Sequence, residues 1–203
     1  MKSIQQEHKT PARAPAEDGI LLARDMTAKG VSRKRIMEMT RQGELLHIGR
    51  GLYSRPDANV TENHTLAQVC ARVPHGIICL ASALQFHGIG TQNPWQVWTL
   101  IEKTARPPRL EYPPLQIVRA SGQAFSEGVE ESRIEGVIVH VTCIAKTVAD
   151  CFKYRSRVGL DVALEALKEC LSESRVDRAL LHHYARVCRV EQIIRPYMEA
   201  LAI

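Results

Sequence analysis

The spacing of apolar residues predicts two short helices near the start of the chain. Residues 19–29 place apolar side chains at helical spacing, and Gly30 supplies a helix stop. Ser32 is a candidate N-cap for a second helix over residues 32–42, which Gly43 ends. Two helices joined by a short turn that contains glycine predict a helix-turn-helix.

A β-hairpin is predicted directly after the second helix. Apolar runs at residues 45–48 and 52–54 flank the segment Gly49-Arg50-Gly51, and glycine permits the positive φ angles of tight hairpin turns. A hairpin in this place turns a helix-turn-helix into a winged helix-turn-helix. Pro56 ends the pattern, so we predict a winged helix-turn-helix domain with a basic N-terminal arm at residues 1–58.

The sequence pattern does not decide whether a further helix precedes residue 19. Pro11 and Pro15 interrupt helical structure in the predicted arm. A complete winged domain has a further helix before residue 19. That helix is either short, near residues 4–9, or missing from this chain.

The remainder, residues 59–203, predicts a larger mixed α/β domain. Strands are expected at about residues 77–79, 96–101, 115–119, 132–134 and 137–141. Helices are expected at about residues 61–73, 80–87, 144–154, 160–171, 176–188 and 190–201. The predicted fold class is therefore α+β, an N-terminal winged helix-turn-helix followed by a larger mixed α/β domain that ends in a helical bundle.

The composition and charge of the chain indicate which partners and which cellular location to expect. The 203 residues carry a formal net charge of +5, which is compatible with binding to nucleic acid. No apolar run approaches the roughly 20 residues of a membrane span, and the first residues lack the apolar core of a secretory signal. We expect a cytoplasmic protein that does not bind membranes.

The six cysteines do not indicate a metal site. They are scattered, with no C-x-x-C pair and no histidine pair at zinc spacing, and most lie among apolar residues. We expect reduced, buried thiols, no bound metal and no cofactor. The cysteines are Cys70, Cys79, Cys143, Cys151, Cys170 and Cys188.

An enzyme is the weaker alternative, and a metal-dependent nuclease is its most specific form. Asp150, Glu165, Lys168 and Glu169 lie near one another in sequence, as residues of such a site would. Such a site needs carboxylates placed to hold Mg²⁺ and a lysine that faces the phosphate. Glu165 and Lys168 instead have the i, i+3 spacing of a helix-surface ion pair. We therefore expect no catalytic residues.

The second helix has one apolar face and one basic face. Ile36, Met39 and Thr40 have the spacing of a buried stripe. A recognition helix packs one face on its domain and presents the other to the major groove, where Arg and Lys contact bases or phosphates. The predicted DNA-binding residues are Ser32, Arg33, Lys34, Met37, Arg41 and Arg50. A solvated basic helix and a plain hairpin turn are the alternatives.

Several short segments resemble the AbiEi antitoxins of abortive-infection type IV toxin–antitoxin systems. They lie in both predicted domains and together extend over most of the chain after the arm. The segments are Ala28–Arg33, Arg41–Leu45, Ile48–Tyr53, Ala81–Ile89 and Val141–Asp150.

The resemblance implies more than the residues show by themselves. It implies a transcriptional autorepressor, with a role in phage defence, that binds inverted repeats in double-stranded promoter DNA. It also implies that residues 59–203 form an antitoxin domain, which counters a nucleotidyltransferase-like toxin without a stable complex. Whether the protein binds DNA as a homodimer is not decided by the resemblance. The alternative function is a stand-alone winged-helix regulator with a C-terminal dimerisation or protein-interaction domain.

Overall fold

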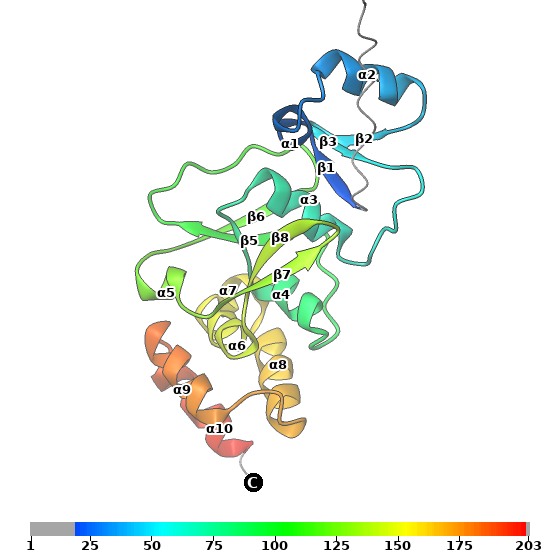
Figure 1. Ribbon diagram of the computed structural model, residues 1–203. Helices are drawn as coiled ribbons and strands as arrows, with labels where there is room; N and C mark the ends of the chain where they lie inside the picture. The colour runs from blue at the N-terminus through cyan, green and yellow to red at the C-terminus, as the bar shows by residue number, and fades with distance from the viewer. Residues whose placement is uncertain (1–18, 202–203) are drawn as a thin grey trace, which may run out of the picture. The chain divides into compact units, whose positions relative to one another are not determined.

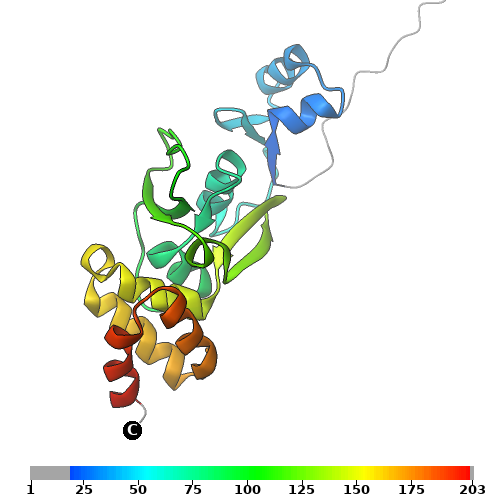
Figure 2. The ribbon, with the colours of Figure 1, turned by 90° about the vertical axis from the view of Figure 1, so that its left-hand side faces the viewer.

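The computed structural model describes residues 19–201 (Figures 1 and 2). The chain divides into two compact units, Met1–Val60 and Thr61–Ile203. Each unit has its own sheet and its own buried core. The predicted arm and the further helix near residues 4–9 lie outside the described residues.

From residue 19 onward, the first unit contains two helices and a three-stranded antiparallel sheet of order β1-β3-β2. Its core is made by Leu21, Met26, Val31, Ile36, Met39 and Leu45. The elements are β1 (Ile20–Leu22), α1 (Ala23–Ala28), α2 (Arg33–Arg41), β2 (Leu46–Gly49) and β3 (Leu52–Ser54).

One local prediction in this unit is wrong. The first helix begins at Ala23, because residues 20–22 form β1 and pair with β3. The pairing continues into the helix start, where the Ala23 amide donates to the Gly51 carbonyl at 2.9 Å. The backbone groups of residues 20–22, which the apolar spacing places in a helix, thus form their hydrogen bonds with the hairpin.

The second predicted helix is confirmed as α2. The Ser32 hydroxyl oxygen accepts a hydrogen bond from the Arg35 amide at 3.1 Å, which is an N-cap. Ile36 and Met39 are buried on one side, and the partly buried Thr40 hydroxyl donates to the Ile36 carbonyl. The helix is followed by Gly43 at φ 76°, a conformation that glycine adopts without steric strain.

The second unit is built on a five-stranded mixed sheet of order β6-β5-β4-β8-β7. The central strand β4 is parallel to β8 and antiparallel to β5, while β6 is parallel to β5 and β7 is antiparallel to β8. The strands are β4 (Ile77–Ile78), β5 (Val97–Glu102), β6 (Leu115–Ala120), β7 (Val129–Ile134) and β8 (Val137–Thr142).

Helices surround α6 at one end of this unit (Figure 1). Helix α6 contacts α4, α8, α9 and α10, and all of its residues from Ala145 to Phe152 are buried. The short α5 and α7 were not predicted. The helices are α3 (His64–Arg72), α4 (Leu80–His87), α5 (Gln123–Ser126), α6 (Ile144–Lys153), α7 (Arg155–Val158), α8 (Leu160–Ser172), α9 (Arg178–Val187) and α10 (Glu191–Ala200).

The predicted fold class is confirmed in both units. A helix–turn–helix with a following hairpin comes first, and a mixed α/β unit that ends in packed helices comes second. The apolar stripe of the last helix packs within the unit, where Ile194 and Met198 are buried in the main core.

All six cysteines are free and buried, as the sequence predicts. Burial raises the pKa of the Cys70 thiol to about 12, and burial together with nearby Asp150 raises that of Cys188 to about 12. These thiols therefore stay protonated at neutral pH and act as small apolar side chains.

Candidate nucleic-acid interface

The outward face of α2 presents the residues that the sequence assigns to DNA. Arg33, Lys34, Met37 and Arg41 are all exposed, and 63% of the Met37 surface remains accessible. Ile36 and Met39 hold the opposite face in the core, so the rotation of the helix is fixed by packing. The structure therefore brings these four side chains together on one exposed surface.

The cations on this face have no internal partner among the described residues. Between residues 19 and 201, no side-chain hydrogen bond or ion pair engages Arg33, Lys34 or Arg41. A guanidinium or ammonium group that is exposed and unpaired can neutralise a phosphate without first breaking an ion pair. The face is thus electrostatically suited to a polyanion.

Arg35 differs from its neighbours on the same helix. Its guanidinium lies 3.6 Å from the Glu44 carboxylate and 4.0 Å from that of Glu38, and its side chain is 24% exposed. The two acids neutralise it within the unit. Arg35 is not among the predicted DNA-binding residues, and its i, i+3 spacing to Glu38 is a sequence signal for such a pair.

The hairpin carries Arg50 at its tip. Gly49 pairs with Leu52, so Arg50 and Gly51 form the turn, with Gly51 at φ 74°. Arg50 is exposed, and the strand before it has an irregularity between His47 and Gly49. The turn therefore presents one unshielded cation away from the two strands.

Ser32 has a structural role in this arrangement. Its hydroxyl oxygen caps α2 and holds the first turn of the helix, where backbone N–H groups without helical partners favour anions. Ser32 is also exposed, so its hydroxyl hydrogen remains accessible at the helix start.

The acidic residues of the nuclease alternative make other contacts in the structure. Asp150 pairs with Lys146 inside the core, at 2.5 Å between carboxylate oxygen and Nζ. Glu165 accepts a hydrogen bond from the Thr91 hydroxyl at 3.1 Å, and within residues 19–201 the expected ion pair with Lys168 is not formed. Within residues 19–201, no group of three or more acidic, histidine or cysteine side chains could hold a metal ion.

Lys146 and Asp150 belong to one of the segments that carry the resemblance. Their side chains are 0% and 5% exposed, and the Cys188 thiol donates to the second carboxylate oxygen at 3.1 Å. Burial by itself lowers the pKa of Lys146, but the nearby Asp150 carboxylate, with smaller contributions, raises it on balance. The i, i+4 spacing could have indicated this pair, but not its burial.

No helix in the described part of the chain is long and apolar enough to cross a membrane. A comparison with curated proteins gave no match.

Similarity to known proteins covers both the fold and the first part of the sequence. The crystal structure of the RV2827C protein from Mycobacterium tuberculosis is similar with a TM-score of 0.57 at 14% identity, over 82% of this chain and 66% of that one. This likeness shows a shared fold, and the chain spans just under two thirds of that protein's length. Residues 10–93 match the family described as transcriptional regulator, AbiEi antitoxin N-terminal domain. The match confirms the resemblance for residues 10–93, which are similar to the N-terminal domain of these antitoxin regulators.

Proposed function

We propose that this protein is a DNA-binding transcriptional autorepressor and the antitoxin of a type IV toxin–antitoxin system. Residues 1–58 bind inverted repeats at its own promoter in the cytoplasm, and residues 59–203 counter a nucleotidyltransferase-like toxin. The observation that carries the DNA-binding part is the exposed, internally unpaired basic face of α2 in a domain of the regulator type.

The chemistry of the face suggests a division of roles. Arg33 lies at the N-terminal end of α2, the end that enters the major groove, and reads guanine through two hydrogen bonds. Arg41 and Arg50 contact phosphates, and Lys34 contacts either a base or a phosphate. Exposed Met37 supplies an apolar surface for a thymine methyl group.

The antitoxin part rests on the family match and on the resemblance of the later segments. The matched region, residues 10–93, extends beyond Val60 and includes α3, β4 and α4 of the second unit. This part of the second unit therefore belongs to the regulator domain in sequence. The proposed functional boundary near residue 58 separates activities and does not follow the end of the family match.

A salt titration of operator and random duplexes tests the DNA-binding part. Arg33→Ala should weaken operator binding by roughly 1–3 kcal/mol and random binding little, since it removes a base contact. Arg50→Ala should flatten the slope of log K against log[salt] by about 0.9, because one phosphate contact is lost. Exposed Arg178 of the second unit gives the control, Arg178→Ala, with the same change of charge. Unchanged affinity and slope in both test variants would rule out this face as the DNA site.

A growth assay separates the antitoxin activity from repression. The full chain with Arg33→Ala and Arg41→Ala is expressed from an unrelated promoter beside the candidate toxin. We expect loss of operator binding together with full rescue of growth. Loss of rescue in this folded variant would contradict the proposed division between the two parts.

A further inference from the structure

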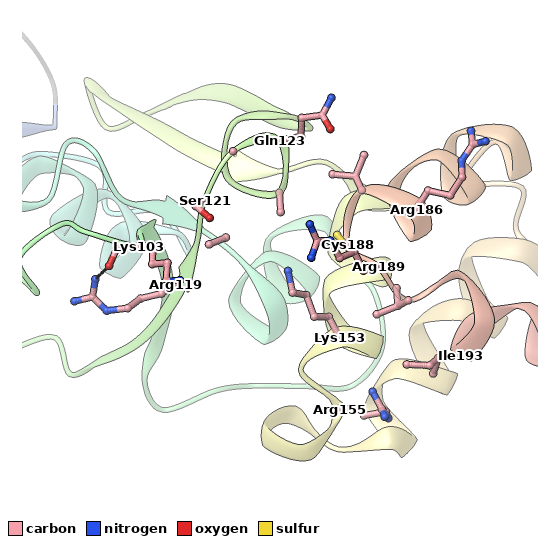
Figure 3. Close-up of a pocket in the computed structure, with 15 residues that line it drawn as sticks. Lys103, Arg119, Ser121, Gln123, Lys153, Arg155, Arg186, Cys188, Arg189 and Ile193 are labelled. Carbon is pink, nitrogen blue, oxygen red and sulfur yellow. Dashed lines mark hydrogen bonds between the residues drawn. The ribbon is translucent and has the colours of Figure 1, made fainter.

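A pocket of about 840 Å³ in the second unit is lined by cations (Figure 3). It lies where the segment after β6 approaches the ends of α6 and α9 and the start of α10. None of the described residues that line it carries a carboxylate. Its cations are Lys103, Arg119, Lys153, Arg155, Arg186 and Arg189.

Two of these cations are fixed by backbone carbonyls. Arg119 donates from Nη1 to the carbonyls of Lys103 and Ala105, at 2.7 and 2.8 Å. Arg155 donates from Nη1 to the Phe152 carbonyl at 2.9 Å. These contacts orient the guanidinium groups but leave their charge uncompensated.

Across residues 19–201, no ion pair neutralises any of the six cations of the pocket. Figure 3 shows Lys153 and Arg189 reaching toward the middle of the pocket, with Lys103 and Arg119 on its other side. Like charges that converge without a counter-ion repel one another, and an anionic ligand relieves that repulsion.

Arg189 occupies a backbone position that favours glycine. It follows the end of α9 with φ 60°, and the next amide, that of Val190, donates to the Ala185 carbonyl at 2.8 Å. Helices commonly end in this way with glycine, because other residues are strained at positive φ. An arginine here places a cation in the pocket at a conformational cost, which is typical of a functional position.

The size of the pocket and its apolar side indicate the class of ligand. Small-molecule sites in proteins have volumes of roughly 300–1,000 Å³. Val187, Val190 and Ile193 supply an apolar wall beside the cations. Phosphate groups match lysine and arginine, and an apolar wall suits a base or sugar.

We propose that this pocket binds a nucleoside triphosphate, with its phosphates on Lys153 and Arg189. The volume of the pocket suits a single nucleotide, whereas a polynucleotide binds along an extended groove. The site goes beyond the proposed DNA-binding and antitoxin activities and does not depend on either.

Isothermal titration calorimetry on the full chain tests the site. ATP, GTP, CTP and UTP are compared with inorganic tripolyphosphate and with a single-stranded oligonucleotide. We expect at least one nucleotide to bind more tightly than tripolyphosphate. Lys153→Gln combined with Arg189→Gln should weaken that binding at least about tenfold, because two charge-assisted contacts are lost. Arg178→Gln, on the exposed start of α9, is the matched control and should leave it unchanged.

Two further variants keep the result interpretable. Arg189→Gly suits the positive φ, so it should weaken nucleotide binding without lowering the melting temperature. Arg33→Ala with Arg41→Ala should not change nucleotide binding, which separates the pocket from the α2 face.

Three outcomes would overturn the proposal. The first is no nucleotide binding at millimolar concentration. The second is equal binding of tripolyphosphate, which would make the pocket a general polyanion site. The third is binding of the oligonucleotide alone, weakened by the pocket variants, which would make it a nucleic-acid surface.

Discussion

Helix α2 of the first unit and helix α6 of the second use cations in opposite ways. On α2, Arg33 and Arg41 are exposed and have no partner among residues 19–201. On α6, Lys146 is completely buried and pairs with Asp150 one turn later. A basic residue on a helix therefore indicates a nucleic-acid contact only where it is both exposed and free of an internal acid.

The physical reason lies in what surrounds each helix. Helix α2 packs one stripe on a small core and leaves its other face in water. Residues 145–152 of helix α6 are buried, so a charge within this stretch must be neutralised locally. The comparison predicts that substitutions in the buried stretch of α6 act on stability, whereas outward substitutions on α2 act on binding.

The largest expected effect is at the buried pair of α6. Lys146→Met leaves the Asp150 carboxylate buried without its cation, and we expect the free energy of unfolding to fall by roughly 3–5 kcal/mol. Urea unfolding followed by circular dichroism measures it. The double variant Lys146→Met, Asp150→Leu removes both charges and should recover much of the loss. A double variant as unstable as the single one would show that the pair is not the cause.

The next largest effect on stability is expected on the buried face of α2, and the exposed face of the same helix provides the control. Met39 is fully buried, so Met39→Ala should lower the stability of the first unit by roughly 2–5 kcal/mol. Met37 is 63% exposed, so Met37→Ala should change it by no more than about 0.5 kcal/mol. Thermal unfolding compares the two. Equal losses would mean that α2 does not have one buried and one free face.

A smaller effect is expected where α3 contacts the turn between β7 and β8. Burial raises the pKa of Glu135, but hydrogen bonds from His64 and Thr61 lower it on balance. A lowered pKa in the folded state stabilises the fold above the ordinary glutamate pKa, and this contribution is lost as the pH falls through the folded value.

Glu135→Gln should therefore lower the free energy of unfolding by roughly 1 kcal/mol at neutral pH. The difference from the wild type should shrink below about pH 4, near the ordinary glutamate pKa. Denaturant unfolding at several pH values measures the difference. If the difference in the free energy of unfolding stays constant down to acid pH, the effect comes from the shape of the Glu135 side chain and not from its charge.

The smallest effect compares a paired and an unpaired cation on one helix. Arg41→Gln should flatten the salt slope of operator binding by about 0.9, because Arg41 is free to contact phosphate. Arg35→Gln should leave the slope nearly unchanged, since Glu38 and Glu44 already neutralise Arg35. Equal slopes for both variants would show that internal pairing does not decide which cations bind DNA.

Much of the fold could be predicted because it depends on local signals. The predicted helix at residues 80–87 agrees with α4, which ends at Gly88 with φ 61°. The strands predicted at residues 132–134 and 137–141 lie within β7 and β8, which are joined by Glu135 and Gly136 at φ 48° and 80°. Capping residues, glycines and apolar spacing act within a few residues, so the sequence displays them directly.

The candidate site was predictable only in part. The spacing in α2 separated buried from outward residues, since a helix has a fixed periodicity. It did not show that Arg35 is neutralised, because Glu44 lies beyond the helix and approaches through the following turn. The cationic pocket had no sequence signal, because Lys103, Lys153 and Arg189 come from separate elements.

The sequence by itself determined most of the helices and strands, where α2 begins, and which of its faces is basic. Tertiary structure decided that residues 20–22 form a strand, that β4 lies between β5 and β8, and that Lys146 is buried. Helical and strand periodicity is a property of neighbouring residues, whereas strand partners, burial and charge neutralisation depend on residues far apart in the chain. These long-range contacts form only when the core closes, so no local pattern records them.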